Sequence, residues 1–324
     1  MKRNIAVLMG GFSSEKDISI KSGNVIYNNI DRESYIPYKV IISKEKWVYL
    51  DDNNVEFKVS KDDFSIEVDK IKIKFDVAFI VIHGSPGEDG LLQSYFELLG
   101  VPFTGCDSYT SSITFNKRDC ISILQKHDIP SANSVHLNIG DTINENEIIE
   151  KVGIPCFVKA NKSGSSFGIY KVNDRKDLTS SINNSFKIDN EVLIESFLDG
   201  TEVSVGVMNY KNEIKVLGIT QLITENDFFD YNAKYEGESK EITPANISEL
   251  QKNNVTKIAK KIYKKLGLKG FSRGEFIFIG DNPYFIEINS IPGMTNESIF
   301  PKQAKNYGIS LKDLCTEVIE QAIK

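Results

Sequence analysis

The sequence predicts a protein that combines an α/β unit with two α+β units. Two short runs, residues 5–9 and 77–82, are wholly apolar, which is typical of parallel strands that are covered on both faces. Later strands come in pairs separated by short turns, as in antiparallel hairpins. The 324 residues exceed what one ordinary core needs. We therefore expect three units, at residues 1–104, 105–191 and 192–324.

The first unit alternates strands with helices. A strand at residues 4–9 ends in Gly10-Gly11 and precedes a helical pattern. A second strand, at residues 73–82, leads into a polar, glycine-rich loop at 83–90. The helix that follows ends at Gly100, in the position that glycine favours after a helix. This order predicts a small, doubly wound, Rossmann-like domain.

The two later units mix hairpins with helices. In the second, we expect a helix at 109–126, strands at 134–137, 156–160 and 168–172, and a glycine- and serine-rich hairpin loop at 161–167. In the third, helices are expected at 247–266 and after Ser310. A long polar stretch with aromatic residues, at 224–245, has the character of a functional lid.

Composition excludes several classes of function. The net charge of −6 does not suit a nucleic-acid-binding protein, which usually carries a basic patch. The apolar runs are too short for a signal peptide or a membrane span. The four cysteines lie far apart without a CxxC spacing. We interpret them as reduced thiols of a cytoplasmic protein, with neither disulfides nor zinc.

Familiar nucleotide and hydrolase motifs do not explain the glycine-rich segments. The chain lacks GxxxxGK[ST] and the GxGxxG spacing. Residues 164–168 match GxSxG, but a strand follows them and all three histidines precede the serine, so the hydrolase interpretation fails. The same loop, with Lys159 before it, could instead cover a phosphate through backbone N–H groups. A plain surface hairpin is the alternative.

Residues 273–289 carry the most specific pattern. They predict a hairpin with a three-residue turn at 280–282, which places Glu275 opposite Glu287 on one face. Two opposed carboxylates destabilise a sheet unless a cation lies between them. With the amide of Asn289 they form an oxygen ligand set that suits Mg²⁺, while Arg273 could bind a phosphate or an oxyanion. A solvated acidic face is the alternative.

Two further pairs give weaker signals. Glu195 and Glu202 flank a turn that contains Phe197, an arrangement that could hold a purine and its ribose but equally suits ordinary packing. Glu15 and His83 each follow the end of an apolar strand, where open α/β sheets bind ligands. A helix-start glutamate and a capping histidine are the alternatives.

Nine segments in a fixed order resemble the D-alanine–D-alanine ligases of the ATP-grasp superfamily, nearly from end to end. They include the sequences AVLMGGFSSEKDIS, VIHGSPGEDG and FIEINSIPGMTNES, and they lie at residues 6–19, 81–90, 102–107, 115–119, 157–168, 192–202, 228–235, 271–276 and 285–298. The resemblance implies an ATP-grasp fold, α/β and α+β, with an N-terminal Rossmann-like pre-ATP-grasp domain and two α+β ATP-grasp subdomains. It also implies a cytoplasmic homodimer that makes D-alanyl-D-alanine for peptidoglycan.

The resemblance also implies roles for individual residues. ATP would contact Lys117, Lys159, Glu195, Phe197, Leu198, Glu202 and Lys234. Two Mg²⁺ or Mn²⁺ ions would bind Glu275, Glu287 and Asn289. The two D-alanines would contact Glu15, His83, Arg273, Gly293 and Ser298, and Ser165 and Tyr235 would join Glu15 in holding the lid closed. Arg273 and the Gly293 N–H would stabilise the tetrahedral oxyanion.

The chain departs from the family pattern at several positions. Glu275 stands where Asp is common, Ala160 where Pro is usual and Phe229 where many members have Tyr, whereas Ile291 and Glu297 differ near the second substrate. A ligase for D-lactate, D-serine or another second substrate is therefore an alternative, although Tyr235 favours an amine nucleophile. A non-catalytic nucleotide-binding protein would be expected to lack Lys234, Arg273, Glu287 or Asn289, and all four are present.

Overall fold

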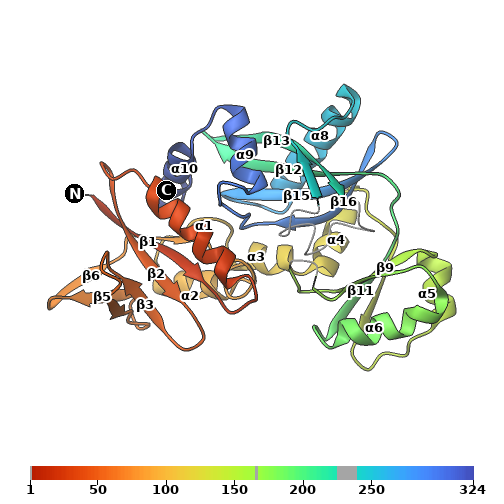
Figure 1. The fold of residues 1–324 in the computed structure, drawn as a ribbon, viewed down its shortest axis with the longest axis horizontal. Coiled ribbons are helices and arrows are strands. Elements are labelled where there is room, and N and C mark those ends of the chain that lie inside the picture. The colour runs from red at the N-terminus through yellow and green to blue at the C-terminus, as the bar shows by residue number, and fades with distance from the viewer. Residues whose placement is uncertain (1, 165–166, 225–238) are drawn as a thin grey trace.

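The computed structural model describes residues 2–164, 167–224 and 239–324. Within these ranges the elements form three groups, each built around one sheet (Figure 1). The N-terminal group is red to orange, the middle group yellow to green and the C-terminal group largely blue. Ser165, Lys234 and Tyr235, together with most of the expected lid, lie outside the described residues.

The N-terminal group contains the predicted parallel strands. β1 (Arg3–Gly10) pairs in parallel with β2 (Tyr35–Ile42) and with β7 (Val77–Ile80). Two antiparallel strands, β3 (Trp47–Leu50) and β4 (Glu56–Lys58), extend the sheet beyond β2. The helices are α1 (Lys16–Asn29) and α2 (Leu91–Leu99). This arrangement confirms an α/β unit with an antiparallel edge.

The single strand expected at residues 73–82 is divided in the structure. Its first part belongs to β6 (Ile71–Lys74), which forms a separate hairpin with β5 (Ser65–Val68). Asp76 separates β6 from β7 because its carboxylate accepts a hydrogen bond from the Asn4 N–H at 2.7 Å. The polar residue thus ends one hairpin and sets the start of the parallel sheet.

The middle group has a wholly antiparallel sheet in the order β10-β9-β11-β8. Its strands are β8 (Ser134–Asn138), β9 (Cys156–Ala160), β10 (Ile169–Val172) and β11 (Glu191–Ser196). The accompanying helices are α5 (Glu145–Val152), the short 3-10 helix η1 (Arg175–Asp177) and α6 (Leu178–Phe186). The predicted β9–β10 hairpin is confirmed. Because β11 belongs to this sheet, the sheet continues past the expected boundary at residue 191, and the division into domains stays a prediction.

The prediction of one continuous helix at residues 109–126 is wrong, because the structure has two helices there. α3 (Ser108–Phe115) ends at Asn116, whose backbone is extended, and α4 (Lys117–Gln125) begins at the next residue. The Asn116 side chain accepts the Asp119 N–H and so caps α4, which favours the break. The break places Lys117 at the start of α4.

The C-terminal group is a five-stranded antiparallel sheet in the order β14-β13-β12-β15-β16. Its strands are β12 (Thr201–Tyr210), β13 (Glu213–Thr224), β14 (Ser239–Ile242), β15 (Phe271–Ile279) and β16 (Asn282–Asn289). The helices are α8 (Glu249–Lys265), α9 (Ile299–Tyr307) and α10 (Leu311–Ile323). Among its described residues, this group therefore has one helix more than the two expected.

The β15–β16 hairpin reaches the predicted register by a different route. The turn has two residues, 280 and 281, rather than three, since Ile279 pairs with Asn282. An even turn alone would put Glu275 and Glu287 on opposite faces. However, the register shifts between Glu275 and Phe276, where Ile286 is left without a partner in the ladder. This bulge restores the pairing of Glu275 with Glu287.

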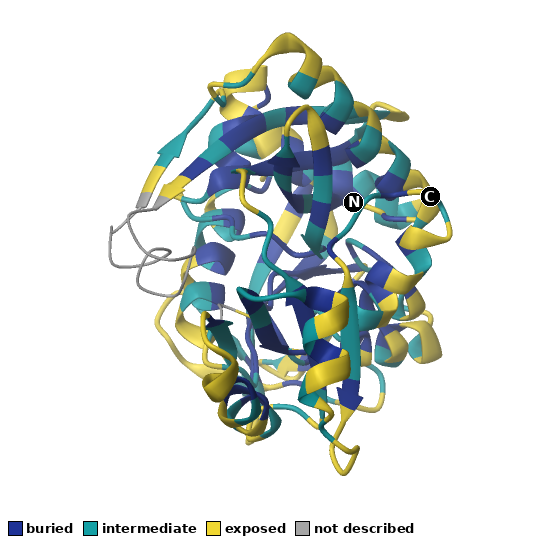
Figure 2. Ribbon diagram, turned by 90° about the vertical axis from the view of Figure 1, so that its right-hand side faces the viewer, coloured by how far each residue is buried: buried dark blue, intermediate teal, exposed yellow. Residues whose placement is uncertain are grey.

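Helix α10 joins the C-terminal group to the N-terminal one. Its Leu314 and Val318 belong to the same apolar cluster as Ile5 and Val7 of β1. Buried residues fill the strands and the inner sides of the helices, as Figure 2 shows. Across residues 2–164, 167–224 and 239–324, no helix combines the length and the apolar character needed to cross a membrane. This shared apolar cluster holds the N-terminal and C-terminal groups in a fixed position relative to each other.

Candidate active site

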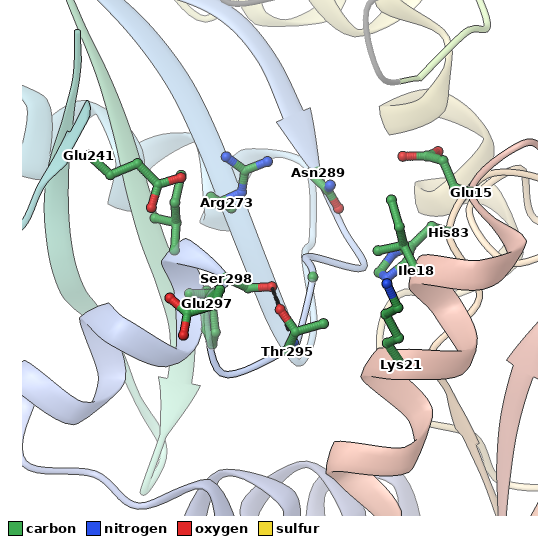
Figure 3. Close-up of a pocket in the computed structure, with 13 residues that line it drawn as sticks. Glu15, Ile18, Lys21, His83, Glu241, Arg273, Asn289, Thr295, Glu297 and Ser298 are labelled. Carbon is green, nitrogen blue, oxygen red and sulfur yellow. Dashed lines mark hydrogen bonds between the residues drawn. The ribbon is translucent and has the colours of Figure 1, made fainter. Parts of the chain in front are cut away.

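A cavity of about 420 Å³ lies between the N-terminal and C-terminal groups (Figure 3). One wall comes from α1 and the end of the N-terminal sheet, and the other from β15, β16 and the loop that leads into α9. The wall residues that the sequence predicted are Glu15, His83, Arg273, Asn289, Gly293 and Ser298. Segments that are far apart in the chain therefore meet in one place.

His83 is fixed between the two walls. Its Nδ1 donates a hydrogen bond to the Ile291 carbonyl at 2.9 Å, and its Nε2 lies 3.3 Å from the Ser22 Oγ. The Ser22 Oγ in turn accepts the Met294 N–H at 3.2 Å. Burial lowers the pKa of the His83 imidazole, against the opposing effect of the Glu15 carboxylate. The ring is thus a neutral positioning group at neutral pH.

Glu15 extends toward a second, smaller pocket that also reaches the glycine-rich loop. This pocket is lined by Glu88, Lys117, Gly164 and Glu287 among others. A Cβ atom added to Gly164 would stand only 2.8 Å from the Glu15 carboxylate. Because glycine has no side chain, the loop at residues 161–164 can approach Glu15 closely.

Lys117 connects the glycine-rich loop to the acidic hairpin. Its Nζ donates a hydrogen bond to the Ser163 carbonyl at 2.7 Å and lies 3.4 Å from the Glu287 carboxylate. An anion placed between the loop and the hairpin would therefore meet this ammonium.

Lys159 and Glu195 form a buried ion pair on adjacent strands, β9 and β11. The ammonium lies 2.7 Å from the carboxylate, and the two residues are 9% and 2% exposed. Burial by itself would lower the pKa of the Lys159 ammonium, but the Glu195 carboxylate raises it above its usual value. Within the described chain, the buried Oε1 of Glu195 has no hydrogen-bond partner. A bound ligand with a polar N–H could supply one.

Arg273 lies beside the hairpin carboxylates. Its guanidinium donates to the Glu275 carboxylate and to the Ser204 Oγ, the latter at 3.1 Å. The register pairs Arg273 with Asn289 and Glu275 with Glu287. The Asn289 Oδ1 accepts the Ile291 N–H at 2.9 Å. The predicted metal ligands therefore lie side by side, next to a guanidinium.

The loop before α9 forms the floor of the larger cavity. The Thr295 Oγ1 and Ser298 Oγ are 2.8 Å apart, and a Cβ atom on Gly293 would lie 2.9 Å from that Ser298 oxygen. Glycine is therefore required where the loop folds back on itself. The predicted substrate contacts Gly293 and Ser298 are neighbours in space.

Three further predicted nucleotide contacts, Phe197, Leu198 and Glu202, lie from the end of β11 to the start of β12. The Phe197 ring packs against Phe157, with centroids 6.1 Å apart, and the Lys171 Nζ lies 4.9 Å from its centroid. Leu198 follows Phe197, and Glu202 pairs with Ile277 in the larger sheet. These residues therefore lie at the junction of the two sheets, as a hinge site requires.

The sequence did not single out Glu88, which the structure places in the smaller pocket. Its carboxylate accepts the Gly84 N–H at 2.6 Å. Burial raises the pKa of the Glu88 carboxyl to about 8, and the nearby Glu15 carboxylate adds to the rise. The sequence shows that Glu88 belongs to the glycine-rich loop at residues 83–90. No pattern in the sequence reveals that its carboxyl group lies close to Glu15.

We expect the substitution Glu88→Gln to flatten the pH dependence of stability in metal-free protein. In the fold Glu88 keeps its proton up to about pH 8, whereas the unfolded chain releases it near 4.5. The wild type should therefore lose stability as pH rises between these values, and glutamine should not. Urea denaturation at about pH 5 and pH 8 measures the difference. Parallel pH profiles for the two proteins would contradict this assignment.

Comparisons with known proteins agree on one family. A family model described as "D-ala D-ala ligase N-terminus" matches residues 4–106, and one described as "D-ala D-ala ligase C-terminus" matches residues 123–320. A D-alanine–D-alanine ligase from Flavobacterium johnsoniae is 56% identical over 99% of each chain. Another, from Christiangramia forsetii, is 51% identical over 100% of this chain and 99% of its own.

Solved structures are similar over the whole fold. D-alanyl-alanine synthetase A from Vibrio cholerae has a TM-score of 0.89 at 27% identity and covers 99% of this chain and 98% of its own. The VanG D-Ala:D-Ser ligase from Enterococcus faecalis has a TM-score of 0.87 at 29% identity, covering 99% and 100%. The fold is thus shared with ligases that differ in their second amino acid.

Proposed function

Because the chain belongs to the D-alanine–D-alanine ligase family, we propose that it joins two D-alanines into D-alanyl-D-alanine while ATP is converted to ADP and phosphate. The observation that carries the proposal is that Arg273 lines both the larger and the smaller cavity. It stands beside the paired carboxylates of Glu275 and Glu287, and the Lys117 ammonium lies 3.4 Å from Glu287. We further propose that the dipeptide enters peptidoglycan synthesis and that the protein acts in the cytoplasm.

ATP would bind between the middle and C-terminal sheets. The buried Oε1 of Glu195, without a hydrogen-bond partner in the described chain, would accept an N–H from the adenine amino group. Phe197 and Leu198 would contact the base and Glu202 the ribose. Lys117 and Lys159 would neutralise phosphate charge, and Lys234 would contribute from outside the described residues.

The ligand set of Glu275, Glu287 and Asn289 fits Mg²⁺ or Mn²⁺. Two carboxylates pair directly across antiparallel strands, an arrangement that is unfavourable without a cation. At present Arg273 and Lys117 supply the positive charge near them. An amide oxygen beside two carboxylates gives an all-oxygen site that suits hard divalent ions. We propose that two ions bind here and that the ATP phosphates supply further oxygen ligands. Such ions would neutralise charge on the transferred phosphate.

The proposed mechanism has two steps. The carboxylate of the first D-alanine attacks the γ-phosphate of ATP, giving an acyl phosphate and ADP. The amine of the second D-alanine then attacks the acyl carbon, and phosphate leaves. Glu15 would hold the first ammonium beside His83, and Arg273 with the Gly293 N–H would bind the tetrahedral oxyanion. Ser165 and Tyr235 would act with Glu15 to exclude water.

Phosphate release by the purified protein with Mg-ATP tests the proposed function. We expect release that requires D-alanine, is absent with L-alanine, and accompanies a dipeptide detected by mass spectrometry. Release that needs D-alanine together with another amino or hydroxy acid would assign a different second substrate. A protein that binds ATP but releases no phosphate with D-alanine would refute the proposed activity.

The family implies a homodimer, and we propose that exposed apolar residues on α2 and α3 form its interface. Leu91 and Leu98 on α2 and Tyr109 on α3 are 60%, 88% and 72% exposed. The Ser108 Oγ donates to the Glu97 carboxylate at 2.6 Å, which holds the two helices together. Such a patch on a surface is typical of an interface.

We expect the wild type to be a dimer by light scattering and Leu98→Lys to have half its mass, because a charge would be buried in the interface. Tyr307→Lys, which changes an exposed aromatic residue on α9, is the control and should stay dimeric. A monomeric wild type, or a dimeric Leu98→Lys variant, would contradict this interface.

A further inference from the structure

Polar side chains form a row across the C-terminal sheet. Glu287 of β16 pairs with Glu275 of β15, which pairs in turn with Ser204 of β12. Ser204 also pairs with Thr220 of β13. The Thr220 Oγ1 lies 2.7 Å from the Thr243 Oγ1, just beyond the end of β14. Because directly paired residues share one face of a sheet, the row runs from the proposed metal ligands to the opposite edge.

Gln303 of α9 contacts the middle of this row. Its Nε2 donates hydrogen bonds of 2.9 Å to the Ser204 carbonyl and to the Thr220 Oγ1. Gln303 is fully buried, and among the described residues its Oε1 has no hydrogen-bond partner. An unpaired buried oxygen costs free energy, whereas an apolar side chain would fill the same space without that cost. Packing of α9 alone therefore does not explain a glutamine here.

Two glycines make room for the Gln303 side chain. Gly206 of β12 and Gly218 of β13 face each other in the sheet. A Cβ atom on Gly206 would overlap the Gln303 Oε1, and one on Gly218 would lie only 2.8 Å from the Gln303 Cβ. Gly206 also pairs with Arg273 on its other side. The amide of Gln303 is therefore set into a notch of the sheet, beside the strand position of Arg273.

Ser204 connects this amide to the site. Its Oγ accepts a hydrogen bond from the Arg273 guanidinium at 3.1 Å and donates one to the Glu275 carboxylate at 3.4 Å. The same guanidinium also donates to Glu275. Gln303 thus holds the backbone of the residue whose hydroxyl binds the guanidinium. A shift of that backbone would change the direction in which the guanidinium points.

The two groups proposed to bind the oxyanion come from different elements. Arg273 belongs to β15, whereas Gly293 lies in the loop that leads into α9. We infer that Gln303 is a positioning residue, which ties α9 to β12 and so fixes Arg273 relative to the Gly293 N–H. This inference rests on the proposed function and adds a residue that acts through Ser204, without touching the substrates.

Gln303→Met tests this role. Methionine has a similar length and fits irregular space, but it cannot donate the two hydrogen bonds. We expect kcat to fall roughly tenfold, the size of effect expected when one to two neutral hydrogen bonds are lost. KM for ATP should stay at the wild-type value, because the interaction serves the transition state. A folded Gln303→Met variant with the wild-type kcat would overturn the inference.

The Arg273→Lys background shows whether Gln303 acts through Arg273. Adding Gln303→Met to Arg273→Lys should lower kcat far less than Gln303→Met does alone, because the guanidinium to be positioned is already gone. An equal loss in both backgrounds would overturn the inference, since Gln303 would then act independently of Arg273.

Thr220→Val is a smaller change on the same path. It keeps the branched shape of the side chain and removes one of the two acceptors that hold the Gln303 amide. We expect a lower kcat, again with the wild-type KM for ATP. If Gln303→Met does not fold, an unchanged kcat in Thr220→Val would overturn the inference in its place.

Gln321→Met is the matched control. Gln321 lies on α10, and its Nε2 donates to the Asn209 carbonyl of β12 at 2.7 Å. The substitution therefore removes a similar hydrogen bond to the same strand, and Gln321 lines neither of the two site pockets. Its kcat should equal that of the wild type. A loss as large as that of Gln303→Met would overturn the inference, whereas a wild type that forms no dipeptide with D-alanine would refute the proposed function itself.

Discussion

Replacing Lys159 with methionine should destabilise the fold by about 3–5 kcal/mol, since removing one partner leaves a buried charge uncompensated. Methionine keeps the length and packing of the lysine stem but not its charge. The Glu195 carboxylate, 2% exposed, would then have neither its ammonium partner nor access to water. The free energy of unfolding in urea at neutral pH measures the effect.

Two further variants show whether the loss of stability comes from the unpaired Glu195 carboxylate. Lys162→Met removes an exposed pair with Glu191, at 3.1 Å, and should change stability by less than about 1 kcal/mol. Adding Glu195→Gln to Lys159→Met should recover part of the loss, because the unpaired charge is gone. A Lys159→Met variant as stable as Lys162→Met would show that the pair does not hold the two strands together.

Arg273→Lys should lower kcat by about 10²- to 10³-fold, the size of effect seen when one oxyanion donor is removed. Lysine keeps the charge beside Glu275, so the protein should stay folded. It lacks the planar fork that serves Glu275, the Ser204 Oγ at 3.1 Å and a reacting oxyanion together. ADP release with saturating D-alanine gives kcat, and thermal unfolding checks the fold.

Arg175→Lys is the control for this substitution. Arg175 lies in η1 of the middle group, makes an exposed ion pair with Glu145 at 3.1 Å and lines neither of the two pockets. Its kcat should match that of the wild type. If Arg273→Lys loses less than about fivefold in kcat while remaining folded, Arg273 does not stabilise the transition state.

The sequence predicted those parts of the fold that local patterns encode. Continuous apolar runs identified β1 and β7 as parallel strands, and two strand-like segments joined by a short glycine-bearing loop identified the β9–β10 hairpin. The sequence did not predict the helix break at Asn116, because the residues on both sides of it are helical. Its cause is partly tertiary, since the Asn161 Nδ2 donates to the Asn116 Oδ1 at 2.7 Å.

The site was predicted in the same uneven way. Residues whose chemistry is visible in a motif, such as Arg273 and Glu287, were proposed from the sequence, and the structure brings them to one hairpin. Glu88 was not, because its environment depends on which distant groups surround it. No spacing in the sequence reveals that Glu88 lines the same pocket as Glu15.

The bulge at Ile286 holds one residue that a regular ladder would not need. Deleting Ile286 alone should leave Phe276 opposite Phe285 and Glu275 opposite Glu287, so the two carboxylates would still share one face. Keeping Ile286 but pairing it with Glu275 in a regular ladder would instead turn Glu287 to the far face. The bulge therefore absorbs a one-residue difference in length that would otherwise separate the two carboxylates.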